Sequence, residues 1–125
     1  MKGSLLKALR LLGDENRLRM LRLLAQEELS VAELQEILGL GQSRISMALA
    51  QMKQADLVEL RRAGQKSLYQ VAESLPDLIR QVLTESAAQI PATRQDDRAL
   101  SIVLGKRKDR LRDYFDELAG RFGRD

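Results

Sequence analysis

Two short amphipathic segments, separated by a three-residue turn, constrain the fold of this 125-residue chain more than any other feature. The first, residues 30–38, opens with the S-x-x-E spacing of a capping box, in which Ser30 and Glu33 each satisfy the other's free backbone N–H. Gly39 ends it, because glycine adopts the left-handed conformation of a helix C-cap at little cost. The second segment covers residues 42–54. Two helices joined by so short a glycine-containing turn are typical of a helix-turn-helix.

The second segment begins with polar side chains opposite its apolar stripe. Ile45, Leu49 and Met52 share one helical face, which we expect to be buried. Hydrogen-bonding groups at a helix N-terminus suit base edges in the DNA major groove, and the free N–H groups there suit a phosphate. Alternatively, these side chains are solvated surface groups, or residues that only favour the start of a helix. The predicted DNA contacts of this helix are Gln42, Ser43, Arg44, Ser46, Met47 and Gln51.

A basic hairpin is predicted directly after this helix, over residues 57–71. Apolar and charged residues alternate in its first half, and Gly64 supplies a turn because it tolerates positive φ. The whole chain has a net charge of +3, but residues 42–69 hold five cations and two carboxylates, whereas residues 14–40 hold three cations and six carboxylates. Positive charge is therefore concentrated where a winged helix would meet DNA. The predicted DNA contacts of this wing are Arg61, Arg62, Gln65 and Lys66.

Histidine and cysteine are absent from the chain. Imidazole general bases, thiolate nucleophiles and disulfides are therefore excluded. Zinc, copper or nickel would have only carboxylate side chains as ligands, which suit these metals poorly. We predict no catalytic residue, no metal site and no cofactor, and we expect that the chain is not an enzyme. No stretch approaches the ~20 apolar residues of a membrane span, so we expect a cytoplasmic protein without membrane contact.

Leucine-rich helical stripes flank the helix-turn-helix and its wing. Aromatic residues make up only 3% of the sequence, so aliphatic side chains must fill the core, which favours helices. We predict a mainly α fold with a small β-hairpin: a winged helix-turn-helix over residues 1–90 and a C-terminal helix for dimerisation or connection over residues 91–125, capped by Thr93 with Asp96. One small domain can bury few such stripes, so we predict a homodimer. The alternative is that the stripes pack against one another in the core of a single chain. The predicted interface comprises Leu5, Leu6, Leu9, Leu12, Leu78, Val82, Leu83, Leu100, Val103 and Leu104.

The order and spacing of these elements resemble the ArsR/SmtB family of bacterial winged-helix repressors. The resemblance covers about residues 5–72 and rests on LKALRLLGDENRLRMLRLL followed by ELSVAELQEILGLGQSRISMALAQMKQADLVELRRAGQKSLYQV. It implies a homodimeric repressor that binds double-stranded operator DNA and releases it when an unidentified small-molecule effector binds. Ala48-Leu49 stands where the family often has His-Leu, which alters a DNA contact and leaves the helix intact. The family's metal-sensing cysteines and histidines are missing, so we do not expect metal or arsenic sensing.

The segment RKDRLRDYFDELAGRF, residues 107–122, is similar to the connector found where such a winged helix precedes a methyltransferase domain. This similarity implies an alternative function, a regulatory or protein-interaction module related to the N-terminal part of such a fusion. It also makes S-adenosylmethionine or S-adenosylhomocysteine a candidate effector. The chain has no glycine-rich loop after a strand, so it does not itself contain the methyltransferase.

Overall fold

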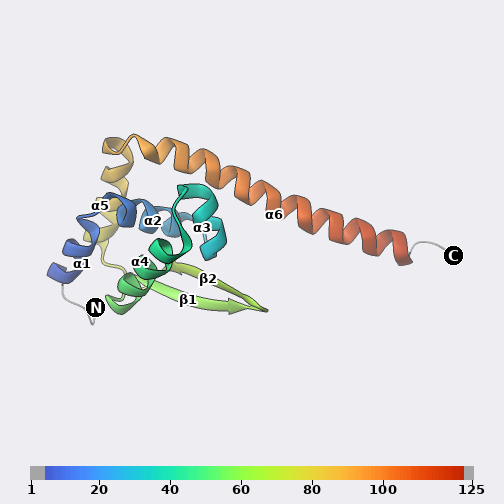
Figure 1. The fold of residues 1–125 in the computed structure, drawn as a ribbon, viewed down its shortest axis with the longest axis horizontal. Helices are drawn as coiled ribbons and strands as arrows, with labels where there is room; N and C mark the ends of the chain where they lie inside the picture. The colour runs from blue at the N-terminus through green and yellow to red at the C-terminus, as the bar shows by residue number, and fades with distance from the viewer. Residues whose placement is uncertain (1–4, 123–125) are drawn as a thin grey trace.

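The computed structural model describes residues 5–122 and has a mainly helical winged helix-turn-helix architecture with one added long helix (Figure 1). This confirms the predicted fold class. The described elements follow one another in the order α1 (Leu5–Leu12), α2 (Glu15–Gln26), α3 (Val31–Leu38), α4 (Gln42–Gln54), β1 (Val58–Ala63), β2 (Lys66–Val71), α5 (Asp77–Gln89) and α6 (Ala92–Phe122).

The helix-turn-helix consists of α3 and α4. Local signals define both ends of α3. The Ser30 hydroxyl accepts from the Glu33 backbone N–H at 3.2 Å, while the Glu33 carboxylate accepts from the Ser30 N–H at 3.0 Å, so the predicted capping box is formed. Gly39 ends α3 with a φ of 69°, in the left-handed region. The buried faces of α3 and α4 then meet in the core through side chains such as Leu34 and Leu49.

The wing is an antiparallel hairpin whose register runs from Val58 opposite Val71 to Ala63 opposite Lys66. This register leaves a two-residue turn, and Gly64 occupies its first position with a φ of 65°, as type II′ hairpin turns require. The base of the wing is tied to the loop before α3, because Leu29 and Tyr69 exchange two backbone hydrogen bonds of 3.0 and 2.8 Å. The orientation of the wing relative to α3 is therefore fixed.

Helix α6 has 31 residues, which corresponds to a length of about 45 Å. Its first half packs against α2 and α3, and its second half projects beyond the body on the side of the wing (Figure 1). Thr93 and Asp96 do not form the predicted cap. The Thr93 hydroxyl instead donates to the carbonyl oxygens of Ala87 and Ile90 at 3.0 and 2.8 Å, and the Asp96 carboxylate binds Arg19.

The structure divides the predicted dimer residues into two groups. Leu12, Leu83, Leu100 and Val103 are only 2–6% exposed within the single chain, where they pack in its own core and leave little surface for a partner. Leu104 is half-buried against the same core. The side chains that remain accessible lie on α1 and α5, and they are Leu5, Leu6, Leu9, Leu78 and, half-buried, Val82.

Candidate nucleic-acid interface

Helix α4 has one face in the core and the opposite face in solvent. Ile45, Leu49 and Met52 are fully buried, as their spacing predicts. All six side chains of α4 predicted to contact DNA are exposed, and Met47 is 64% exposed although it is large and apolar. Gly41 precedes the helix and provides no side-chain cap, so the first backbone N–H groups of α4 have no capping acceptor. Such an end can donate to an anion.

The tip of the wing carries cations that differ in their partners. Arg62, Gln65 and Lys66 are exposed, and neither Arg62 nor Lys66 forms an ion pair with any residue between positions 5 and 122. Arg61 is also exposed, but its guanidinium donates to both carboxylate oxygens of Glu28 at 2.7 and 2.8 Å. The sequence prediction missed this pairing, because the two residues are 33 positions apart.

The hydrogen bond from Arg61 lowers the pKa of the Glu28 carboxyl below its ordinary value. Glu28 is therefore ionised at neutral pH, and a DNA phosphate that binds Arg61 has to displace a carboxylate. Arg62 and Lys66 present no such competition. They are the wing cations that are directly available to an incoming anion.

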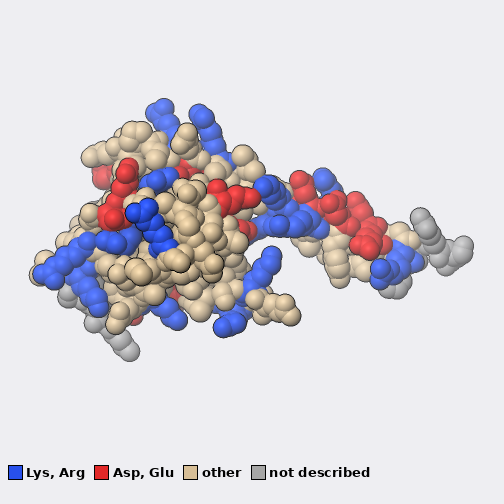
Figure 2. Space-filling model, viewed as in Figure 1, with Lys and Arg blue, Asp and Glu red and all other residues tan. Residues whose placement is uncertain are grey.

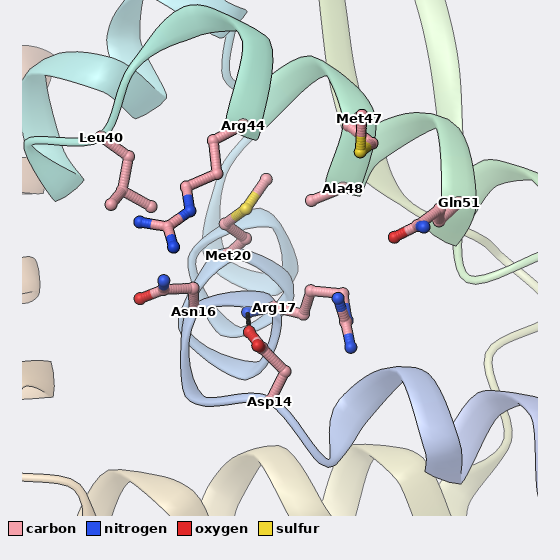
Figure 3. A pocket seen from close by; sticks show the side chains of 9 residues that line it. All are labelled: Asp14, Asn16, Arg17, Met20, Leu40, Arg44, Met47, Ala48 and Gln51. Atoms are coloured by element: carbon pink, nitrogen blue, oxygen red, sulfur yellow. Dashed lines mark hydrogen bonds between the residues drawn. The ribbon is translucent and has the colours of Figure 1, made fainter.

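A groove of about 280 Å³ separates α4 from the beginning of α2 (Figure 3). The Arg44 guanidinium and the Gln51 amide point into it from α4, opposite Asn16 and Arg17 from α2. Sequence reasoning missed Asn16 and Arg17 as neighbours of α4. The available signal was their place in the first turn of a helix capped by Asp14, but only the tertiary fold shows that this turn lies beside α4.

Several carboxylates of α3 and the loop before it are paired with basic residues of α6. The guanidinium of Arg107 donates to the Glu33 carboxylate at 2.5 and 2.6 Å and to the Glu28 carbonyl oxygen at 2.8 Å. Lys106 lies 2.8 Å from the Glu36 carboxylate. In contrast, Arg44 on α4 forms no ion pair within the described part of the chain. Arg44 therefore carries unpaired positive charge, as Arg62 and Lys66 of the wing do.

The described residues offer neither a metal centre nor a membrane span. Between positions 5 and 122, no three histidine, cysteine, aspartate or glutamate residues gather in a way that could hold a metal ion. None of the helices in that range is both long and apolar enough to cross a membrane.

Comparisons with known proteins agree with this architecture. Residues 14–59 match the family described as bacterial regulatory protein, arsR family. Over 69 residues the chain is 41% identical to the arsenic resistance transcriptional regulator ArsR1 of Pseudomonas putida. The match spans 54% of each protein, so the chain covers about half the length of that curated relative.

Two solved structures are also similar. Reduced HlyU from Vibrio cholerae has a TM-score of 0.60 and 28% identity, covering 69% of this chain and 87% of HlyU. The second is the homodimeric winged helix-turn-helix DNA-binding domain of Mb0332 from Mycobacterium bovis, described as a possible ArsR-family transcriptional regulator. It has a TM-score of 0.55 and 27% identity, and the match covers 66% of this chain and 73% of that domain. The family match spans both helices of the helix-turn-helix, and both solved structures share the fold, so this part of the chain is similar to the ArsR family of winged-helix transcriptional regulators.

Proposed function

We propose that the protein is a homodimeric transcriptional repressor that binds double-stranded operator DNA through α4 and the wing. One observation carries this proposal. The uncapped start of α4 exposes Gln42, Ser43 and Arg44, and the wing that follows α4 carries the cations Arg62 and Lys66, which form no ion pair in the described structure. The groups that a major groove and its flanking phosphates require thus occur on the two consecutive elements with which winged helices meet DNA. No catalytic role is proposed, and the regulator acts in the cytoplasm, where it meets DNA.

The two elements have different tasks in this proposal. Helix α4 enters the major groove, where Arg44 and Gln51 have the donors and acceptors that distinguish base edges. Arg62 and Lys66 of the wing bind phosphates, which supply affinity and salt dependence but no direct sequence information. Asn16 and Arg17, across the groove from Arg44, extend the same polar surface.

The proposed dimer uses the accessible leucines of α1 and α5. Leu5, Leu6, Leu9 and Leu78 are 40–65% exposed, and large apolar side chains left in solvent are candidates for an interface. The homodimeric state of Mb0332 supports a dimer but does not say which surface forms it. A two-fold dimer presents two α4 helices to half-sites separated by one or more turns of DNA, about 34 Å each. An effector releases the operator if it binds more tightly to a dimer in which the spacing of the two α4 helices does not fit DNA.

The experiment is a fluorescence-anisotropy titration of DNA from the region upstream of the protein's own gene, with a random duplex of equal length as competitor. Each titration is made at two salt concentrations. Arg44→Ala should lower affinity for the preferred DNA about tenfold and affinity for random DNA much less, because a base contact is lost. Lys66→Ala should weaken binding to both duplexes alike. It should also reduce the slope of log affinity against log salt concentration by about one.

Arg98→Ala is the matched control, since Arg98 is an exposed arginine on α6, away from α4 and the wing. It should leave both affinities unchanged. Equal losses on both duplexes for Arg44→Ala and Lys66→Ala would contradict the division of tasks. DNA binding that is weak and insensitive to salt in the wild type would contradict the proposed function itself. The dimer is tested separately, because Leu6→Glu should shift the protein to monomer in sedimentation analysis.

A further inference from the structure

The wing and α6 form the two walls of a cleft with a volume of about 460 Å³, within the size range of small-molecule sites (Figure 2). Arg107, Arg110, Leu111 and Tyr114 of α6 line one wall, at the i, i+3, i+4 and i+7 spacing that puts side chains on one helical face. Lys66 and Leu68 of β2 line the other wall, two positions apart and so on one face of the strand. Each wall therefore offers cations next to apolar side chains.

The charge at the inner end of the cleft is already balanced. Glu33 is the carboxylate that lines it, and that carboxylate binds Arg107 and caps α3. Lys66 and Arg110 form no ion pair with any residue in positions 5–122. Two positive charges, one on each wall, thus remain available, and Figure 2 shows Lys and Arg side chains on both sides of the hollow between the wing and α6.

The apolar part of the cleft is unusually open to solvent. Leu111 is 56% and Tyr114 57% exposed, and Leu68 on the opposite wall is only half-buried. An aromatic or other flat apolar group placed between these walls would remove apolar surface from water on both of its faces. Apolar walls with a few convergent polar groups are the usual composition of a small-molecule site.

We propose that the cleft between the wing and α6 binds a small organic anion. Its acidic group lies between Lys66 and Arg110, and its flat apolar body packs against Leu68, Leu111 and Tyr114. The ligand connects the tip of the wing to a helix that is anchored on the body by Arg107. The ligand class follows from the pairing of two free cations with exposed apolar side chains on facing walls.

Occupation of the cleft has a consequence for DNA binding, and this step alone rests on the proposed function. Lys66 lines the cleft and is also a proposed phosphate contact. An anion held by Lys66 neutralises the charge that the phosphate would meet, so the ligand and DNA compete for one side chain. The cleft is in this way suited to be the effector site of the regulator.

The first test is a fluorescence titration of the full chain, without DNA, with 8-anilinonaphthalene-1-sulfonate, an aromatic sulfonate whose emission rises in apolar surroundings. We expect saturable binding of one probe per chain. Arg110→Glu should weaken it roughly tenfold or more, since a charged contact becomes repulsive. Tyr114→Ala should weaken it severalfold by removing apolar contact. All of these variants alter exposed side chains, and circular dichroism shows whether they remain folded.

Two control variants make the titration specific to this cleft. Lys108→Glu reverses an exposed cation on the same helix that does not line the cleft. Ile90→Gln alters another apolar groove, between α2 and α5, at a residue outside the proposed dimer interface. Both should leave probe affinity within twofold of the wild type. The proposal is wrong if the wild type shows no saturable binding, if Lys108→Glu weakens binding as much as Arg110→Glu, or if Ile90→Gln abolishes it.

The second test repeats the DNA titration with the probe at saturating concentration. DNA affinity should fall severalfold for the wild type and stay unchanged for Arg110→Glu. An unchanged affinity of the wild type, with its cleft occupied, would refute the sharing of Lys66. If the protein proves not to bind DNA, the proposed function fails, and the probe titration still decides independently whether the cleft binds an organic anion.

Discussion

Asp96 and Asp97 make the same contact in different surroundings, so they form a natural pair for testing what anchors α6. The Asp96 carboxylate accepts two hydrogen bonds from Arg19, at 2.7 and 2.8 Å, and the Asp97 carboxylate accepts two from Arg22, at 2.8 and 2.9 Å. The Asp96 side chain is 2% exposed and that of Asp97 is 44% exposed. Burial is thus the main difference between the two ion pairs.

This difference determines the expected cost of removing each carboxylate. Asp96→Ala leaves the guanidinium of Arg19 desolvated without a counter-ion, a change that typically costs about 3–5 kcal/mol of the free energy of unfolding. Asp97→Ala leaves Arg22 with access to water from the side that the partly exposed carboxylate occupied, so its loss should cost less, on the order of 1 kcal/mol. Since the whole domain is stable by about 5–15 kcal/mol, the first change should be severe and the second mild.

Thermal unfolding followed by circular dichroism at one fixed protein concentration measures both effects. The concentration is held constant because dimerisation would make Tm depend on it. We expect Tm to fall on the order of 10–20 °C for Asp96→Ala and by less than about 5 °C for Asp97→Ala, given the size of the chain. Urea unfolding of the same variants gives the free-energy difference directly.

Equal losses of stability in the two variants would refute the reasoning, because burial would then not control the strength of the pair. A double substitution tests the cause further. Arg19→Met with Asp96→Leu removes both charges, and it should recover much of the stability that Asp96→Ala loses, since no buried charge is left unpaired. If the double variant is no more stable than Asp96→Ala, the loss comes from packing and not from the guanidinium.

Three further predictions concern pH, the wing and metal. Burial alone would raise the pKa of Glu33, but hydrogen bonds from Arg107 and Ser30 lower it below its ordinary value, so its stabilising effect is present above pH ~4.5 and is lost as pH falls through the folded-state pKa. Urea unfolding of Glu33→Gln should show a shallower loss of stability below pH ~4.5 than wild type, and an identical loss would argue against this origin. Glu28→Gln should free Arg61 and raise DNA affinity severalfold at low salt, whereas a decrease would mean that the pair positions the wing. Elemental analysis of untagged protein should find no stoichiometric zinc or nickel, and one metal ion per chain would overturn that prediction.

The elements defined by local rules could be predicted from the sequence. Ser30, Glu33 and Gly39 delimit α3 through contacts between neighbours in the chain, and Gly64 defines the turn of the wing for the same reason. The exposed face of α4 also follows from helical spacing alone. That these exposed side chains contact DNA stays a proposal, and the similarity of residues 107–122 to a methyltransferase connector stays a prediction.

The errors arose where a distant residue competes with a local rule. The predicted cap at Thr93 and Asp96 failed because Asp96 binds Arg19, which is 77 positions away. The role of Arg61 was incomplete because its partner Glu28 comes from the loop before α3. Four predicted dimer residues are buried in the core of the single chain, which the sequence did not indicate, because it shows that a stripe is apolar but not which surface covers it. A helix pattern therefore predicts burial better than it predicts the partner.

Helix α6 changes its role close to Arg107, and this position separates two kinds of side chain. Up to that residue, contacts with the body fix the helix, and Arg107 itself is held by Glu33 and by the Glu28 carbonyl oxygen. Every residue from 108 to 117 is exposed, although Leu111, Tyr114 and Phe115 are large and apolar. Substitutions before this position should therefore change the stability of the fold, whereas those after it should change binding. A destabilised but fully competent Asp96→Ala and a stable but probe-deficient Arg110→Glu would together establish that division, because a helix that served only packing could not produce the second result.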